Sequence, residues 1–244
     1  MSVSIIETVG LRWGGLRSQC LDLLFPPRCI RCRQVGAWLC AECLNQTPRL
    51  EASFCARCGS TIADGLCKRC RTPPLQIECI RSVVYSEGVL REAIHRFKYR
   101  GLTALAEPLG GLMAAYWVQH PMPTDVVVPV PLHAARLRER GYNQAALLAC
   151  EMARRVGLAV DGQTLNRQRA TAPQVELDAS QRRENVRDAF RCSGNALSGK
   201  QVLLVDDVCT TGSTLEACAL ALYEGGAHAV RALTLACARY GKPG

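Results

Sequence analysis

The chain lacks the features of several large protein classes. No apolar run among its 244 residues is long enough to cross a bilayer, so no membrane-spanning helix is expected. The first residues, Met-Ser-Val-Ser-Ile-Ile-Glu, have neither the basic start nor the small-residue cleavage site of a secretory signal. We therefore expect a cytoplasmic protein.

Two common nucleotide-binding signatures are also missing. The sequence contains no Gly-Lys-Ser or Gly-Lys-Thr of a Walker A loop and no Gly-x-Gly-x-x-Gly fingerprint, so ATP and NAD are poor candidates. Lysine is scarce too: only four of the 30 basic residues are Lys, and the net charge of +9 rests mostly on Arg. Arginine suits bidentate phosphate recognition, although codon bias of the genome is an equally good explanation. A polyanionic partner fits this charge without being required by it.

Cysteine, by contrast, is abundant, and its arrangement points to metal. Eight of the 15 cysteines form four Cys-x-x-Cys pairs. Two such pairs supply the four thiolates of a tetrahedral structural zinc site, and metal is more common than disulfides in a cytoplasmic protein. We expect two structural zinc ions and sequential pairing, with interleaved pairing left open. The expected ligands are Cys29, Cys32, Cys40 and Cys43 for one ion, and Cys55, Cys58, Cys67 and Cys70 for the other.

The segment 201–215 has the strongest functional pattern. An apolar run, 202–205, is typical of a strand buried in a parallel sheet, and Asp206 and Asp207 end it. A hydroxyl-rich turn and a helix follow, and Ser213 with Glu216 predicts a capping box at the start of that helix. A turn of this kind at a helix N-terminus suits a phosphate, whereas carboxylates suit hydroxyl groups. A sugar phosphate offers both.

The remaining segments predict an α/β fold. Strands are expected at 81–85, 125–131 and 229–236, and helices at 89–99, 107–117 and 143–156. Strands that alternate with helices indicate a parallel sheet flanked by helices. We expect three parts: a packing segment at 1–24, a zinc-binding domain at 25–75 and the α/β domain at 76–244.

A cationic loop is expected after the strand at 125–131. It contains Arg136, Arg138 and Arg140 and ends at Gly141. A loop that follows a strand of an open α/β sheet lies at the crevice where such sheets bind ligands, so these arginines suit a diphosphate. An ordinary solvated loop is the alternative.

Several motifs together resemble the ComF/GntX (competence protein F) family. They are 129–133 (Pro-Val-Pro-Leu-His), 136–144, Arg169-x-Thr-x-x-Gln, Arg183-x-Asn-Val and 201–215, after the cysteine block. The resemblance implies a type I phosphoribosyltransferase fold with an N-terminal double zinc ribbon, and a role in natural transformation.

The same resemblance implies the ligands. Asp206 and Asp207 would bind the ribose hydroxyls of phosphoribosyl pyrophosphate, and Mg2+ would accompany its diphosphate. The 5′-phosphate would lie in the turn formed by Thr210, Thr211, Gly212, Ser213 and Thr214; the diphosphate-side candidates are His133, Arg136 and Arg140. Single-stranded DNA and the DNA-uptake machinery are the implied macromolecular partners.

Two classes of function remain open. One is a protein that binds phosphoribosyl pyrophosphate and handles single-stranded DNA; the other is an active phosphoribosyltransferase that transfers phosphoribose to a base. No catalytic residue is assigned, because a lone His such as His95 or His133 is more often structural. His95, Lys98 and Arg100 are candidates for a base-recognition hood by position alone. The absence of a recognisable hood favours the binding function.

Overall fold

The computed structural model describes residues 26–47, 50, 55, 57–59, 65–71, 76–169 and 188–238. The chain divides into two compact units, Met1–Gln46 and Thr47–Gly244. The expected packing segment at 1–24 lies outside the described residues. Among those that are described, no helix is long and apolar enough to cross a membrane.

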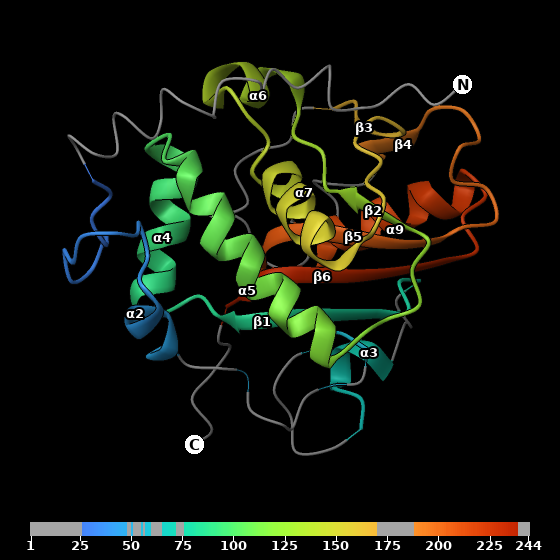
Figure 1. Ribbon diagram of the computed structural model, residues 1–244. Coiled ribbons are helices and arrows are strands. Elements are labelled where there is room, and N and C mark those ends of the chain that lie inside the picture. Colours follow the sequence, from blue (N-terminus) through green and yellow to red (C-terminus); the bar gives the residue numbers. More distant parts are fainter. Residues whose placement is uncertain are drawn as a thin grey trace. The chain divides into compact units, whose positions relative to one another are not determined.

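The larger unit is built on a parallel four-stranded sheet in the order β1-β6-β5-β2 (Figure 1). Its strands are β1 (Cys79–Tyr85), β2 (Val126–Pro129), β5 (Gln201–Cys209) and β6 (Ala229–Cys237). The apolar run 202–205 is fully buried in the central strand β5, as expected for a strand covered on both faces. The predicted α/β fold with a parallel sheet is confirmed.

Helices cover both faces of this sheet. α5 (Ala106–Gln119) and α7 (Gln144–Val156) pack on each other and lie in front of the sheet in Figure 1. α9 (Ser213–Glu224) lies on the other face, against β6 and the antiparallel pair β3 (Leu165–Arg167) and β4 (Phe190–Cys192). The other described elements are α2 (Ala41–Asn45), α3 (Lys68–Arg71), α4 (Gly88–Tyr99), η2 (Thr103–Leu105) and α6 (Ala134–Arg140).

Strand β5 is longer than its apolar run indicates. Asp206 and Asp207 do not end it, because β6 continues to pair alongside: Asp206 lies opposite Thr234 and Cys209 opposite Cys237. The acidic pair is therefore held inside a hydrogen-bonded sheet.

The predicted capping box is wrong. The N-cap of α9 is Gly212, in the left-handed region at φ 73°, which has no side chain, and the N–H of Ser213 donates to the hydroxyl of Thr211 at 3.4 Å. The carboxylate of Glu216 instead accepts backbone N–H groups of Gln76 (2.6 Å) and Ile77 (3.3 Å). Glu216 thus ties the segment before β1 to α9.

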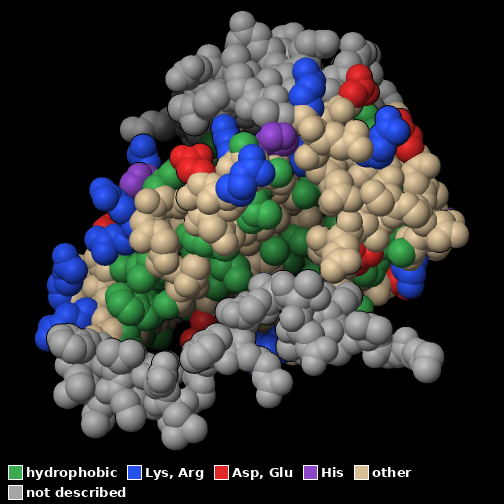
Figure 2. Space-filling model, turned by 90° about the horizontal axis from the view of Figure 1, so that it is seen from above, with side chains coloured by type: hydrophobic (Ala, Val, Ile, Leu, Met, Phe, Trp, Pro, Cys, Tyr) green, Lys and Arg blue, Asp and Glu red, His purple; other side chains and the backbone are tan. Residues whose placement is uncertain are grey.

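The expected cationic loop is the helix α6. His133 caps its start by accepting the backbone N–H of Ala135, and Gly141 ends it at φ 82°. Helical spacing places Arg136 and Arg140 on one face and Arg138 on another. Figure 2 views the molecule from the side on which α6 lies in Figure 1, and Lys and Arg side chains recur across that face.

Candidate functional site

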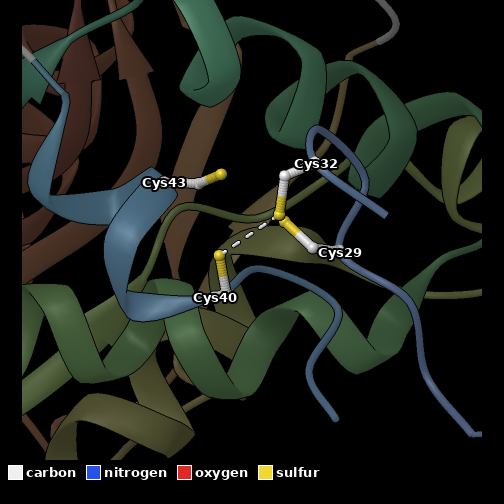
Figure 3. A group of neighbouring side chains, drawn as sticks. All are labelled: Cys29, Cys32, Cys40 and Cys43. Carbon is white, nitrogen blue, oxygen red and sulfur yellow. Dashed lines mark hydrogen bonds between the residues drawn. The ribbon is translucent and has the colours of Figure 1, made fainter. Parts of the chain in front are cut away.

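The first cysteine group lies in the smaller unit. Cys29, Cys32, Cys40 and Cys43 bring their sulfur atoms within 4.8 Å of one another (Figure 3). A tight turn holds the first pair, in which the backbone N–H of Arg33, at φ 65°, donates to the carbonyl of Cys29. The second pair comes from the start of α2, where Cys40 is the N-cap and Cys43 is buried.

The second group lies in the larger unit. The sulfur atoms of Cys55, Cys58, Cys67 and Cys70 also lie within 4.8 Å of one another. Gly59 follows the first pair at φ 70°, and a Cβ there would lie 2.8 Å from the carbonyl oxygen of Ile80, so a side chain would clash with β1. The backbone N–H of Ile80 donates to the carbonyl of Arg57 at 2.6 Å. This cysteine turn is therefore attached directly to the first strand of the sheet.

Both groups have the donor set of a structural zinc site. Zn–S bonds of about 2.3 Å in a tetrahedron separate the sulfur atoms by roughly 3.8 Å. The sulfur atoms of Cys32 and Cys40, 3.6 Å apart, and those of Cys58 and Cys67, 3.5 Å apart, match that spacing. Each group supplies four thiolates, which closes the coordination and leaves no position for a catalytic water.

The electrostatics of the first group also favour a cation. Burial opposes ionisation of Cys29, but backbone N–H groups of Cys40, Cys32 and Arg31 outweigh it and lower the pKa of that thiol to about 6. Burial and the neighbouring thiols raise the pKa of Cys43 to about 12. Four thiols this close cannot all ionise alone, so a divalent cation is what lets all four bind as thiolates.

The acidic pair lies at the carboxyl edge of the sheet. Asp206 and Asp207 follow the buried run of β5, and the backbone N–H of Val130, just after β2, donates to the carbonyl of Val205 at 2.9 Å. The segment that leads to His133 and α6 therefore begins beside the acidic pair. Parallel α/β sheets bind ligands at this edge.

The hydroxyl turn follows the acidic pair directly. Thr211 and Ser213 are buried, and their hydroxyl groups are hydrogen-bonded to each other at 2.8 Å. Gly212 between them takes the left-handed conformation that starts α9, and the first α9 bond runs from Glu216 N–H to the Gly212 carbonyl. The earlier N–H groups of the helix lie outside that ladder, and one of them, that of Ser213, donates to the hydroxyl of Thr211 at 3.4 Å. A helix N-terminus favours an anion by its dipole.

Lys98 from α4 neutralises one member of the acidic pair. Its Nζ lies 2.9 Å from Oδ1 of Asp207, a residue that is only 3% exposed. Burial alone would lower the pKa of Lys98, but the carboxylate of Asp207 outweighs it and raises that pKa. Oδ2 of Asp207 is buried and has no hydrogen-bond partner among the described residues. Among the described residues, therefore, only one of the two carboxylate oxygens of Asp207 is paired.

Asp206 has a different environment. Burial, followed by the charge of Asp207, raises the pKa of Asp206 to about 7, against the opposing charge of Lys98. Its Oδ1 accepts the backbone N–H of Asp207 at 2.8 Å. Near neutral pH Asp206 is therefore partly protonated, beside a carboxylate that is paired with Lys98.

Arg167 on β3 is a basic residue of this region that the sequence did not single out. Burial lowers the pKa of its guanidinium, as does the charge of Arg136, while Cys218 and Asp206 raise it. The guanidinium lies 5.3 Å from the ring centroid of Phe190 on β4. Arg167 thus brings a cation into the electrostatic surroundings of Asp206, and Arg136 in turn acts on Arg167. The only signal was that Arg167 starts an arginine-rich stretch.

The other diphosphate-side candidates have local roles in the fold. Nδ1 of His133 caps α6, and Arg140 donates from Nη1 to Oε1 of Gln144 and lies over the ring of Tyr99. A contact of His133 or Arg140 with a diphosphate stays a prediction. The motif residues Thr171, Gln174, Arg183 and Asn185 lie outside the described residues.

The comparisons with known proteins agree with this architecture. A double zinc ribbon domain model matches residues 20–72, and a phosphoribosyl transferase domain model matches residues 142–243. The DNA utilization protein YhgH of Salmonella typhi is 34% identical, over 86% of this chain and 96% of its own. Competence protein F of Haemophilus influenzae is 30% identical over the same shares of the two chains. The chain belongs to the competence protein F family.

The comparisons also found more distant similarities. Competence protein ComFC of Bacillus subtilis is 27% identical to this family member, over 81% of this chain and 83% of its own. Among solved structures, a B. subtilis glutamine phosphoribosylpyrophosphate amidotransferase has 21% identity and a TM-score of 0.39, over 53% of this chain and 26% of that one. At this level of similarity the comparison says nothing about a ligand.

The zinc sites of this competence protein F family member can be tested by metal analysis. Protein purified without chelator should contain about two zinc ions per chain, and Cys29→Ser or Cys70→Ser should each lose one. Because the second group is attached to β1, Cys70→Ser should also lower the unfolding midpoint of the larger unit, whereas Cys29→Ser should not. Cys150→Ser, at an exposed cysteine outside both groups, is the control. A zinc content near zero in the unaltered protein would contradict both assignments.

The raised pKa of Asp206 predicts a pH dependence of stability. From pH ~4 to ~7 the folded state keeps a proton that the unfolded state releases, so this group makes stability fall as pH rises through that window. Asp206→Asn should therefore raise the urea midpoint of the zinc-loaded protein at pH 8 and change it little at pH 5.

Asp161→Asn is the control, because the pKa of Asp161 is shifted in the opposite direction. Burial raises the pKa of Asp161, but hydrogen bonds from Thr164 and Gln163 outweigh it and lower that pKa. Its stabilisation is present above pH ~4 and is lost as pH falls further, so Asp161→Asn should lower the midpoint at pH 8. Equal midpoint shifts of Asp206→Asn at the two pH values would show that Asp206 does not titrate in this window.

Proposed function

We propose that the carboxyl edge of the sheet binds phosphoribosyl pyrophosphate with Mg2+. The observation that carries this proposal is the direct succession of an acidic pair held in the sheet, of which Asp207 is buried, a left-handed Gly212 turn and the start of α9. A pentose phosphate needs carboxylates for its diol and N–H groups for its phosphate, side by side. The segment 206–214 offers both within a few residues.

Each residue has a distinct role in this proposal. Asp206 and Asp207 accept hydrogen bonds from the ribose hydroxyls, and Lys98 reduces the repulsion between the acidic pair and an anionic ligand. The turn formed by Thr210, Thr211, Gly212, Ser213 and Thr214 holds the 5′-phosphate. Mg2+ supplies charge neutralisation at the diphosphate, where Arg136, Arg140 and His133 are the protein groups proposed to contribute. Arg167 joins them because its charge and that of Asp206 influence each other.

The proposed cellular role is the handling of single-stranded DNA during uptake. Relatives that cover most of this chain are named competence and DNA utilization proteins. The net charge of +9 and the two zinc-type cysteine groups are compatible with a nucleic-acid partner. We place the protein in the cytoplasm, where incoming DNA and the uptake machinery would meet it.

An active phosphoribosyltransferase is the second candidate function. The match of a phosphoribosyl transferase domain model to residues 142–243 favours it. In that case the pocket would also hold a nucleobase, and diphosphate would leave as the base nitrogen attacks the ribose carbon. No described residue is assigned as a catalytic acid or base.

Calorimetric titration with phosphoribosyl pyrophosphate and Mg2+ tests the proposed ligand. Asp206→Asn or Asp207→Asn removes a charge-assisted hydrogen bond to a ribose hydroxyl and should weaken binding roughly ten- to a hundredfold. Thr211→Ala should have a smaller effect, because backbone N–H groups still hold the phosphate. Asp125→Asn is the matched control, since Asp125 accepts the Gln201 N–H at the opposite end of β5. Unchanged affinity in both acidic-pair variants would refute the ribose assignment.

A DNA titration combined with a diphosphate assay separates the two candidate functions. The DNA-handling role predicts binding of single-stranded DNA that is weakly sequence-selective and falls steeply between low and physiological salt. The enzyme predicts diphosphate release with one base from a panel and no salt-dependent DNA affinity. If DNA fails to bind at low salt while one base supports turnover, the protein is a phosphoribosyltransferase and the DNA-handling role is wrong.

A further inference from the structure

An exposed tyrosine stands at the carboxyl-terminal end of α4. Tyr99 is 63% exposed, in a chain with few aromatic residues. The guanidinium carbon of Arg140 lies 5.4 Å from the centroid of its ring. The ring of His95, one helical turn earlier, lies 5.1 Å away at an interplanar angle of 48°. Three side chains with flat or cationic groups thus meet at the surface.

This cluster is not needed to hold α4 against the rest of the unit. Phe97 does so: it is fully buried and lies against the ring of Tyr142, and the hydroxyl group of Tyr142 donates to the carbonyl of Phe97. That contact joins α4 to the turn between α6 and α7 and leaves Tyr99 facing outward. Its exposed ring is therefore available to a partner.

The helices around Tyr99 carry an excess of positive charge. Among the acidic groups of α4, α6 and their ends, Glu92 is paired with Arg96, Glu87 is the N-cap of α4, and Glu139 is exposed. The basic residues of the same two helices and their ends are Arg91, Arg96, Lys98, Arg100, Arg136, Arg138 and Arg140. Even when Arg96 and Lys98, which are in ion pairs, are not counted, the basic residues outnumber the acidic ones. This charge favours a polyanion.

We propose that this Tyr99 surface, formed by His95, Tyr99, Arg100 and Arg140, binds unpaired single-stranded nucleic acid. A base stacks on Tyr99 and Arg140, while Arg100 contacts a flanking phosphate. An exposed ring among arginines is the combination used for strands whose bases are free to stack. Duplex DNA keeps its bases stacked inside the helix and gains only the phosphate contacts. This inference rests on the proposed DNA-handling role and gives it a location.

The carboxyl-terminal end of α5 supplies a control. Tyr116 and His120 form a second His–Tyr pair, four residues apart like His95 and Tyr99, which is stacked with centroids 4.5 Å apart. They lie at the opposite edge of the sheet, because α5 ends shortly before β2 begins and the carbonyl of Pro123 accepts from Arg231 at the start of β6. Tyr116→Ala thus removes a half-buried tyrosine ring beside a histidine, at the other edge of the sheet from the proposed surface.

Fluorescence anisotropy with a labelled single-stranded oligothymidine tests the proposal on the zinc-loaded full chain. Tyr99→Ala should weaken binding about five- to a hundredfold at fixed salt, whereas Tyr99→Phe and Tyr116→Ala should bind as the unaltered protein does. Arg100→Ala should lower the slope of log affinity against log salt by about one phosphate, and Tyr99→Ala should leave that slope unchanged. Thermal unfolding of each variant checks that the fold is intact.

The outcomes distinguish failure of the proposed Tyr99 surface from failure of the proposed DNA-handling role. If the unaltered protein binds no single-stranded DNA even at low salt, both the surface and the DNA-handling role are wrong. If it binds and Tyr99→Ala binds equally well, only the surface is wrong. Equal competition by duplex DNA or by polyglutamate would also overturn the proposal, because it would reduce the surface to an unselective cationic patch.

Discussion

The pairing of β5 with β6 beyond the apolar run is the constraint on which the site depends. Without it, Asp206 and Asp207 would lie in a loop and be solvated. Because β6 pairs through Thr234 and Cys237, the carboxylates are held in the sheet, and Asp207 is almost completely buried. A buried carboxylate needs a charge partner, which Lys98 supplies. The sheet thus buries a negative charge, and α4 supplies the positive charge that pairs with it.

The two cysteine groups stabilise the fold in a different way, by metal coordination. The described residues of the first unit include few large buried side chains, namely Ile30 and Leu39 besides the cysteines. A segment with so small a core gains its fold from metal coordination. The second group is different, because the turn at Gly59 is attached to Ile80 of β1. One metal therefore organises a separate unit, and the other reinforces the edge of the sheet.

The sequence predicted those parts of the fold that depend on local chemistry. The run 202–205 indicated a buried strand because four consecutive apolar residues suit a sheet covered on both faces. The Cys-x-x-Cys pairs indicated closed metal sites because ligand number and spacing are themselves local. The acidic pair and the hydroxyl turn were found for the same reason.

What the sequence could not predict depends on partners far along the chain. The end of β5 is set by β6, and Glu216 binds the backbone of Gln76 and Ile77, 140 and 139 residues away, in place of a local capping box. Lys98 was noted only as a candidate for a base hood, because nothing nearby in the sequence reveals a pair with Asp207. Tertiary contacts override local preference in each case.

Three consecutive residues of α4 connect these levels of structure. Successive helical residues point about 100° apart, so neighbours can serve different surroundings. Phe97 is buried against Tyr142, Lys98 reaches Asp207 in the acidic pair, and Tyr99 faces solvent beside Arg140. Arg140 in turn contacts Gln144 at the start of α7, which packs on β2 and β5. This one turn of α4 is therefore where the packed interior, the acidic pair at the carboxyl edge of the sheet and the exposed Tyr99 ring meet.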